Sequence, residues 1–336
     1  MKCAHPITMR QVAQAGGFAV STVSKALRND PTIPEARCRE IQALAKRLGY
    51  RPNPLVATLM AQLHHRRRCH DPHHIAWIDL WLSPDDKDVA MGATPVLRGA
   101  RERAQEMGYG IEVYPVARDQ MSPERLRRVL TSRGQWGLII PPVPESAMRY
   151  PLDLRGLAAV TIGTSLHESV MHRVSPNHFQ GCALAFEQLG AAGFNRIGLV
   201  LSPAMNKRVE GKWLGAFLAS QQRLPMTHRV AALIAERDDP RALARWLHRE
   251  RPDVVLAAEV FAWRQATHLN RGQARPPAIG WLMKQKKPRG LGYLDYRPEQ
   301  LGRVAVEMVV AQIHRNERSN PTVPQTVLID AVWRDS

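Results

Sequence analysis

Small polar side chains and one lysine follow one another in the run Val20-Ser21-Thr22-Val23-Ser24-Lys25-Ala26-Leu27-Arg28. Short hydroxyls and a methyl group approach base edges closely, and a lysine or arginine reaches guanine O6 and N7, so these residues suit the major groove of DNA. A surface helix that is polar only because it faces water has a similar composition. The interpretation therefore depends on the elements that would position these side chains.

Two short helices joined by a glycine turn are predicted around this run. Thr8-Met9-Arg10-Gln11 fits a capping box, in which Thr8 and Gln11 satisfy each other's backbone amides. The helix is expected to run to about Ala15 and to end at Gly16-Gly17, where freedom at positive φ allows a sharp turn. The next helix, Val20 to Arg28, has an apolar side that can pack on the first helix while its polar groups point outward.

A third helix and a conditional fourth one follow. The third has Pro34 in its first turn and the apolar set Ile41, Leu44, Ala45 and Leu48 at helical spacing. Asn53 as N-cap and Pro54 at the first position start a fourth helix, whose leucines Leu55, Leu59 and Leu63 are four residues apart. A helix of about ten residues is marginal in water, so we expect it to fold only against a partner.

The same part of the chain is its most basic. Residues 1–70 contain 12 lysines and arginines against three acidic residues, so this fifth of the chain has nine of the 17 net positive charges. Such a surface attracts phosphate oxygens and gains from counterion release, which favours a nucleic-acid partner over an acidic protein or a small substrate. A basic, solvated surface without a dedicated partner is the alternative.

The stretch from His64 to His74 combines five histidines, Cys69, three arginines and Pro72, the composition of an exposed connection. Imidazole and thiolate groups suit zinc or copper, but the spacing fits no ordered metal motif. Contacts with backbone phosphates and a linker role are favoured over metal binding, and no metal site is expected.

Several classes of protein are disfavoured by the sequence. No run of about 18 apolar residues or signal-peptide segment is present, which predicts no membrane span and a cytoplasmic protein. The four cysteines are far apart and predict reduced thiols. No nucleophile elbow, phosphate-binding loop, dinucleotide fingerprint or His-Glu-x-x-His motif occurs, so neither enzymatic activity nor a cofactor is expected.

The motifs of the first 59 residues resemble the DNA-binding head of the lactose-repressor (LacI/GalR) family. The matching residues are Val12-Ala13, Ala15-Gly16-Gly17, Val20 to Asn29, Leu48 to Asn53, and Leu59. The resemblance implies that Val20, Ser21 and Lys25 read bases, with Thr22 on the same helix, and that Arg10 and Arg28 touch the backbone or flanking bases. It also implies that Leu59, on the hinge helix capped by Asn53, wedges into the minor groove and kinks the operator.

The head departs from the family pattern at two positions. Ala19 replaces the usual serine that caps the recognition helix, which should weaken the cap by about 1 kcal/mol. Lys25 replaces the more common arginine, and a lysine is a point donor without the bidentate fork. The geometry of the head on DNA is expected to persist, whereas the resemblance does not fix the base preference at the position of Lys25.

From Ile75 onward, apolar runs of strand length alternate with amphipathic stretches of helix length, which indicates parallel sheets covered by helices. The expected strands are 75–82, 111–116, 137–140, 158–162, 197–201, 254–258, 278–282 and 327–332, and the expected helices include 96–107, 179–192, 210–221 and 299–315. A repeated pattern of helix, glycine and strand at 107–111 and 192–197 indicates two halves.

This order resembles the two-lobed core, similar to periplasmic binding proteins, that follows the head in the family. Its landmarks here are Asn177, Leu189, Gly193, Arg196-Ile197-Gly198, Arg208-Val209-Glu210-Gly211, Arg251-Pro252-Asp253 and Gln300-Leu301-Gly302. The resemblance implies that an effector, such as a sugar, binds in a cleft at the strand C-termini through Arg208, Glu259 and Tyr296. Glu259 stands where the family has Asp, and no acidic residue occurs at Trp281-Leu282-Met283, which argues against a plain sugar.

These inferences together predict the organisation of the chain. A small all-α helix-turn-helix head at 7–52 and a hinge with a basic linker at 53–72 precede an α/β core of two lobes. The expected lobes are 73–164 with 297–320 and 165–296 with 321–336.

The predicted function is that of a homodimeric transcription regulator, a repressor of the LacI type. It would bind a pseudo-palindromic operator in double-stranded DNA under the control of a small-molecule effector. The alternatives are a small-molecule binding protein whose basic head binds DNA non-specifically, and an enzyme with an appended DNA-binding segment.

Overall fold

The computed structural model describes residues 7–27, 30, 32–50, 73–81, 89–143, 152–166, 170–261, 266, 277–284 and 290–335. The predicted fourth helix, with Asn53 and Leu59, lies outside the described residues. Arg28 and the histidines at positions 64, 65 and 70 also lie outside them.

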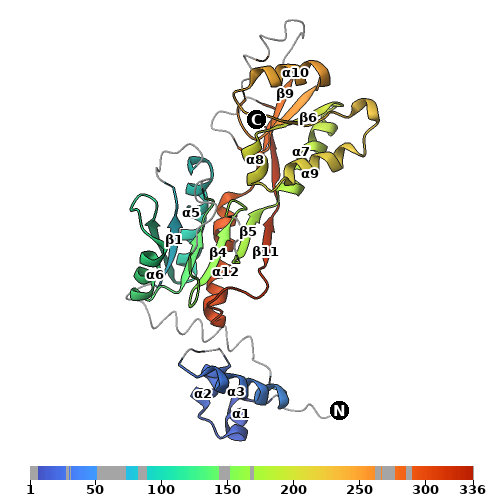
Figure 1. Ribbon diagram of the computed structural model, residues 1–336. Coiled ribbons are helices and arrows are strands. Elements are labelled where there is room, and N and C mark those ends of the chain that lie inside the picture. The colour runs from blue at the N-terminus through green and yellow to red at the C-terminus, as the bar shows by residue number, and fades with distance from the viewer. Residues whose placement is uncertain are drawn as a thin grey trace, which may run out of the picture.

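The N-terminal head consists of three helices, α1 (Met9–Gly16), α2 (Val20–Ala26) and α3 (Glu35–Arg47) (Figure 1). Their shared core is Val12, Ala13, Val23, Ala26, Cys38, Ile41 and Ala45. In α2 and α3 these apolar positions recur every three or four residues, and in α1 two adjacent residues are buried, so each helix buries one side against the other two. Pro34 is the N-cap of α3 rather than a residue of its first turn, because its ψ of 140° is extended.

The first sheet of the core is entirely parallel and has the order β11-β5-β4-β3-β1-β2. Its strands are β1 (His73–Asp79), β2 (Tyr109–Pro115), β3 (Gly137–Ile140), β4 (Ala158–Ile162), β5 (His172–Pro176) and β11 (Thr326–Ile329). Helices α5 (Val89–Glu106) and α12 (Pro298–Arg315) share a hydrophobic cluster with one face of the sheet. Helix α6 (Pro123–Ser132) buries Leu126 and Leu130 against the other face.

The second sheet has the order β12-β10-β9-β8-β6-β7, and only β12 runs antiparallel to its neighbour. Its strands are β6 (Ile197–Leu201), β7 (Leu233–Ile234), β8 (Val254–Ala257), β9 (Ala278–Trp281), β10 (Gly292–Asp295) and β12 (Val332–Asp335). Helices α7 (His178–Ala191) and α9 (Lys212–Gln221) cover one face, and α10 (Pro240–Glu250) covers the other. The short helices α8 (Pro203–Arg208) and η2 (Met226–His228) lie in connections.

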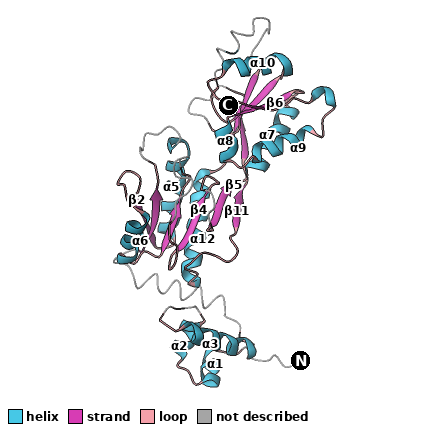
Figure 2. Ribbon diagram, viewed as in Figure 1, coloured by secondary structure: helices cyan, strands magenta, loops and turns pink. Residues whose placement is uncertain are grey.

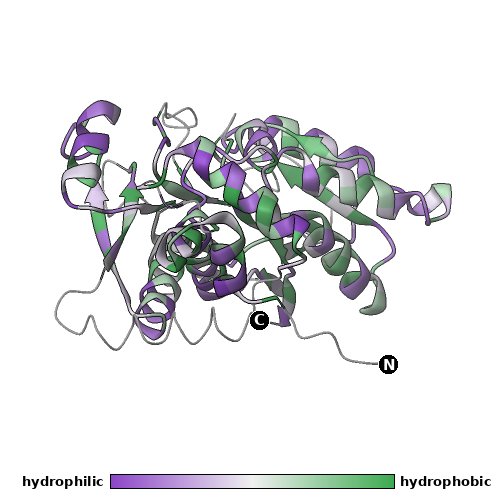
Figure 3. Cartoon of the chain, turned by 90° about the horizontal axis from the view of Figure 1, so that it is seen from below, coloured by the Kyte–Doolittle hydropathy of each residue, from purple (hydrophilic) through white to green (hydrophobic). Residues whose placement is uncertain are grey.

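The two sheets form two lobes, seen one above the other in Figure 2. In Figure 3 the helices carry both hydrophobic and hydrophilic stretches, as expected where one side covers a sheet and the other faces solvent. The predicted helical head and two-lobed α/β core, with parallel sheets flanked by helices, are thus confirmed.

The chain passes between the lobes three times, after β5, after β10 and after β11. The sequence prediction assigned 165–176 and 321–329 to the second lobe, but β5 and β11 pair in the first sheet. The single strand predicted at 327–332 is two strands in different sheets, separated by Asp330 and Ala331. β5 was missed because its sequence is weakly apolar, and the run 327–332 does not reveal that the chain changes sheets at Asp330 and Ala331.

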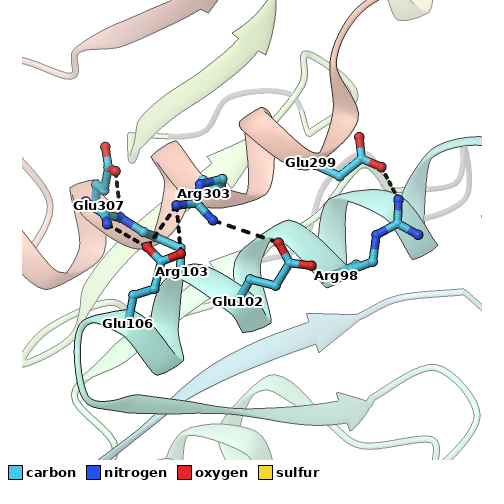
Figure 4. A network of polar contacts seen from close by, with 7 residues as sticks. All are labelled: Arg98, Glu102, Arg103, Glu106, Glu299, Arg303 and Glu307. Atoms are coloured by element: carbon cyan, nitrogen blue, oxygen red, sulfur yellow. Dashed lines mark hydrogen bonds and ion pairs between the residues drawn. The ribbon is translucent and has the colours of Figure 1, made fainter.

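The contact between α5 and α12 is the most extensive between helices of the first lobe, and a ladder of ion pairs lies along it (Figure 4). Arg103 Nε lies 2.8 Å from a carboxylate oxygen of Glu307, and Arg303 Nη2 lies 2.8 Å from one of Glu106. The Arg103 and Arg303 hydrogen bonds lower the pKa of Glu106. A single exposed ion pair contributes little to stability. We therefore expect this ladder mainly to fix the register of α5 against α12.

Candidate functional site

The first candidate site is the exposed face of α2. Val23 and Ala26 are buried against the other two helices, whereas Val20 is 44% exposed and Ser21 and Lys25 are exposed. Ser21 and Lys25 are four residues apart and therefore share one face of the helix. Thr22 and Ser24, which the sequence also placed on the outward side, are half-buried. The three residues that the resemblance assigns to base reading, Val20, Ser21 and Lys25, are exposed.

The turn before α2 depends on two glycines with different roles. Gly17 adopts φ 65°, the left-handed conformation that favours glycine. Gly16 is not left-handed, but a Cβ there would lie 2.5 Å from the Phe18 ring and 2.7 Å from Leu44. The prediction gave positive φ as the reason for both glycines; for Gly16 the reason is instead close packing against the side chains of Phe18 and Leu44.

Hydrogen bonds hold the ends of the α2 region. Lys25 Nζ donates to Thr32 Oγ1 at 3.3 Å, and the Thr32 hydroxyl donates to Asp30 Oδ1 at 2.6 Å. At the end of α2, the Gln42 side-chain amide donates to the carbonyl of Ala26 at 2.9 Å. Lys25, which the sequence predicts to contact DNA, thus belongs to a short hydrogen-bonded network with Thr32 and Asp30 next to the helix.

The predicted capping box is present at the start of α1. Thr8 Oγ1 accepts the Gln11 amide at 3.3 Å, and Gln11 Oε1 accepts the Thr8 amide at 2.8 Å. Arg10, in the first turn that this box fixes, is exposed. Helix α2 has no equivalent, because its N-cap Ala19 has no side-chain oxygen.

Restoring a cap to α2 should stabilise the head. Ala19 has extended backbone angles, φ −69° and ψ 143°, which suit a capping serine. We therefore expect Ala19→Ser to raise the free energy of unfolding of the head by about 1 kcal/mol, and Thr8→Ala to lower it by a similar amount. Urea unfolding followed by circular dichroism measures both. An Ala19→Ser head that unfolds at the same urea concentration as the parent would contradict the cap assignment.

The second candidate site lies where carboxyl ends of strands from the two sheets meet. Arg208 ends α8, which follows β6 of the second sheet. Its guanidinium donates to the carbonyl of Val143, which follows β3 of the first sheet, at 2.9 Å. Its own carbonyl accepts the hydroxyl of Thr164, which follows β4, at 2.7 Å. Arg208 therefore connects the two lobes, at the sheet ends where open α/β folds bind ligands.

The turn after Arg208 extends this connection. Glu210 adopts φ 55° and Gly211 adopts φ 67°, so the helix predicted at 210–221 starts only at Lys212. The Glu210 carboxylate lies 2.5 Å from Lys212 Nζ and 3.9 Å from Arg173 Nη1, which belongs to β5 of the first sheet. An ion pair thus joins the lobes beside the Arg208 hydrogen bonds.

Tyr296 and Glu259, the other two predicted effector residues, also follow carboxyl ends of strands, β10 and β8. The Tyr296 hydroxyl accepts the Trp213 indole N–H at 2.9 Å, and burial raises the pKa of Tyr296 far above its ordinary value. Glu259 accepts the backbone amide of Ser202 at 3.2 Å and lies 3.6 Å from Arg237. Tyr296 is thus a packed residue, and Glu259 lies at the opposite end of α8 from Arg208.

His178, at the start of α7, is a residue that the sequence analysis did not select. Its ring packs edge-on to Trp213 at 4.9 Å and to Tyr296 at 5.1 Å between centroids. Burial, with the positive charges of Lys212 and Arg208, lowers the pKa of His178 to about 3. Its position directly after the landmark Asn177 was the only signal in the sequence.

Among the described residues, no group of three or more histidine, cysteine, aspartate or glutamate side chains could hold a metal ion. Within the described ranges, no helix combines the length and apolar character needed to cross a bilayer.

The N-terminal head matches a known protein family. Residues 8–53 match the family described as bacterial regulatory proteins, lacI family. A curated relative, the HTH-type transcriptional regulator PtxS of Pseudomonas plecoglossicida, is 24% identical over 218 residues, which are 65% of this chain and 60% of PtxS. The ribose operon repressor of Escherichia coli (strain K12) is 23% identical over 58% of this chain and 56% of its own length. The aligned region thus spans 60% or less of these two relatives.

A solved structure aligns with nearly the whole chain. A Lac repressor structure bound to ONPG in the repressed state has a TM-score of 0.53 at 16% identity, and the match covers 98% of both chains.

Proposed function

Because the chain belongs to the LacI family, we propose that it is a sequence-specific DNA-binding transcription regulator, a repressor, whose operator affinity depends on a small-molecule effector. The observation that carries this proposal is the face of α2, where Val20, Ser21 and Lys25 stand exposed on a helix packed against α1 and α3. A second helix held in this way can enter the major groove with side chains facing base edges.

Each predicted DNA-binding residue has a proposed role. Val20, Ser21 and Lys25 contact base edges, with Thr22 beside them on α2. Thr8, Arg10 and Arg28 contact the backbone or flanking bases, since cations and helix starts both favour phosphate. For the hinge we propose that Asn53 caps a helix that places Leu59 in the minor groove.

We propose that the effector binds between the lobes at Arg208. The hydrogen bonds of Arg208 to Val143 and Thr164 support this placement, because they join the carboxyl ends of strands in both sheets. Tyr296 would support the site through Trp213 and His178, and Glu259 would lie at its far edge. The proposed divisions are a head at 7–52, a hinge and linker at 53–72, and lobes that meet near residues 176, 297 and 330.

Operator control then follows from a two-state core. A ligand shifts the arrangement of the lobes only as far as its affinities for the two arrangements differ. In a homodimer, that shift would change the spacing of the paired segments before the core and so form or melt the marginal hinge helices. The protein would act in the cytoplasm as a binding protein without a catalytic step.

Selection from random DNA duplexes tests the proposal. A dimer with two-fold symmetry should recover an inverted repeat whose half-sites face the same side of the duplex, one helical turn or a multiple apart. The full-length protein is immobilised, and bound duplexes are sequenced after several rounds. Recovery of unrelated sequences without symmetry would favour the alternative, a small-molecule binding protein with a non-specific basic head.

A further inference from the structure

The side chain of Lys25 is bonded to the segment that follows α2. Its ammonium nitrogen Nζ lies 3.3 Å from the hydroxyl oxygen of Thr32, and that oxygen lies 2.6 Å from Asp30 Oδ1. Lys25 and Thr32 are both exposed, so this contact lies on the surface that α2 presents to solvent. A side chain expected to reach a base edge is therefore attached to a residue seven positions further along the chain.

The chemistry of the three groups fixes the direction of each hydrogen bond. An ammonium group can only donate, and an ionised carboxylate can only accept. The Thr32 hydroxyl therefore accepts from Lys25 and donates to Asp30. Because the hydroxyl proton points to the carboxylate, the lone pairs of the hydroxyl oxygen stay available to the lysine.

The Thr32 hydroxyl is itself held by a turn of the backbone. The Asp30 amide donates to the Lys25 carbonyl at 3.0 Å, and the Ile33 amide donates to the Asp30 carbonyl at 3.0 Å. Asp30 Oδ1 also accepts the Thr32 amide at 2.9 Å, a bond by which aspartate often stabilises turns. The partner of Lys25 is thus a short side chain on an ordered turn.

This attachment bears on the way in which a lysine can read a base. The ammonium group ends a flexible four-carbon chain and lacks the planar fork of the arginine that the family resemblance leads one to expect here. One of its three N–H donors is used on Thr32, which leaves up to two for an outside acceptor. Guanine offers two neighbouring acceptors in the major groove, O6 and N7, whereas adenine has N7 beside a donor and thymine has O4 alone. The held ammonium group therefore matches guanine best.

We propose that Thr32 is a positioning residue for base reading, which holds the Lys25 ammonium group so that it selects guanine. Thr32 acts through Lys25, and Asp30 orients its hydroxyl. A side chain that is already held also loses less conformational freedom on binding. This inference rests on the proposed function and specifies the base preference at the position of Lys25, which the resemblance does not fix.

Titration of the full-length protein with base-substituted duplexes tests the preference for guanine. The starting duplex is the selected inverted repeat, and Lys25→Ala locates the base pair, because this variant should lose discrimination only there. We expect guanine at that position, and binding weaker by at least about tenfold when adenine replaces it in both half-sites. The analogue 7-deazaguanine, which lacks the N7 acceptor, should also weaken binding. Inosine is the control, since it keeps both O6 and N7 and should bind as guanine does.

Two variants of Thr32 test the positioning role. Thr32→Val removes the hydroxyl but keeps the branched shape and the amide that donates to Asp30. It should lower the preference for guanine over adenine at the Lys25 position by at least about fivefold and leave the preferences at other positions unchanged. Thr32→Ser keeps the hydroxyl and should retain the preference of the parent. Circular dichroism checks that both variants are folded.

A double-mutant cycle separates positioning from a direct contact between Thr32 and DNA. In the Lys25→Ala protein, Thr32→Val should cause no further change in base preference, because the hydroxyl acts only through the lysine. An equal change in both backgrounds would show that Thr32 reads DNA by itself and would overturn the inference.

Three further results would also overturn it: Lys25→Ala without effect on any base preference, a base other than guanine at the position that this variant locates, or a guanine preference that Thr32→Val retains. If the protein still prefers the inverted repeat in such a case, the proposed function stands and only the positioning role is wrong. Equal affinity for the repeat and for a scrambled duplex would contradict the proposed function itself.

Discussion

Alanine at both Ser21 and Lys25 should lower the affinity for the selected inverted repeat by at least about a hundredfold, since each base contact contributes about 1–3 kcal/mol and occurs twice in a dimer. Both side chains are exposed on the same face of α2, so the head should remain folded. Fluorescence anisotropy with a labelled duplex measures the loss, and circular dichroism checks the fold.

Lys46→Ala is the matched control for this variant. Lys46 is an exposed lysine in the last turn of α3, so its removal changes the charge of the head by the same amount as the removal of Lys25. We expect a loss of only a few-fold, equal on specific and unrelated duplexes, as for a contact with phosphate. If the α2 variant showed the same small and uniform loss, α2 would not be the helix that reads bases.

Gly302→Ala should strongly lower the stability of the core. A Cβ at Gly302 in α12 would lie 2.0 Å from the carbonyl oxygen of Val96 and 2.7 Å from the amide nitrogen of Ala100, both backbone atoms of α5. Backbone cannot rotate away as a side chain can, so the two helices would have to separate. We expect a loss of about 2–3 kcal/mol in the free energy of unfolding.

Gly190→Ala provides the control. Gly190 lies near the end of α7, is exposed and has nothing within 4 Å of the position of its Cβ. Alanine should be neutral there or stabilise by up to about 1 kcal/mol, because glycine is the poorer helix former. Urea unfolding of both variants gives the comparison. Equal stability of Gly302→Ala and the parent would show that α5 and α12 are not in contact through their backbones.

The sequence predicted the most buried strands best. The bounds of β3, β4 and β6 match the expected strands, because a strand covered on both faces is a continuous apolar run. β5, with the sequence His172-Arg173-Val174-Ser175-Pro176, was missed because only Val174 is strongly apolar. It is a strand because β4 and β11 pair with its two edges, which depends on residues far away in the chain.

The two candidate sites also differ in how far the sequence could predict them. The three helices of the head could be predicted, because their capping, turn and apolar spacing are local signals. The base contacts of Val20, Ser21 and Lys25 come from the family resemblance and stay predictions.

Of the charged residues at the lobe junction, only Arg208 was predicted as a ligand contact, and it donates to the Val143 carbonyl of the other lobe. Arg173 and Lys212 are 39 residues apart and in different lobes, so only the folded chain brings them to the same carboxylate.

The central claim is that the chain binds one DNA sequence in preference to others. The most direct measurement is a competition titration of the full-length protein with the selected inverted repeat against a scrambled duplex of equal length and composition, at fixed salt. A regulator of this kind should prefer the repeat by about 1,000-fold or more. A ratio near one, with both duplexes released equally as the salt concentration rises, would show a non-specific basic head and contradict the claim.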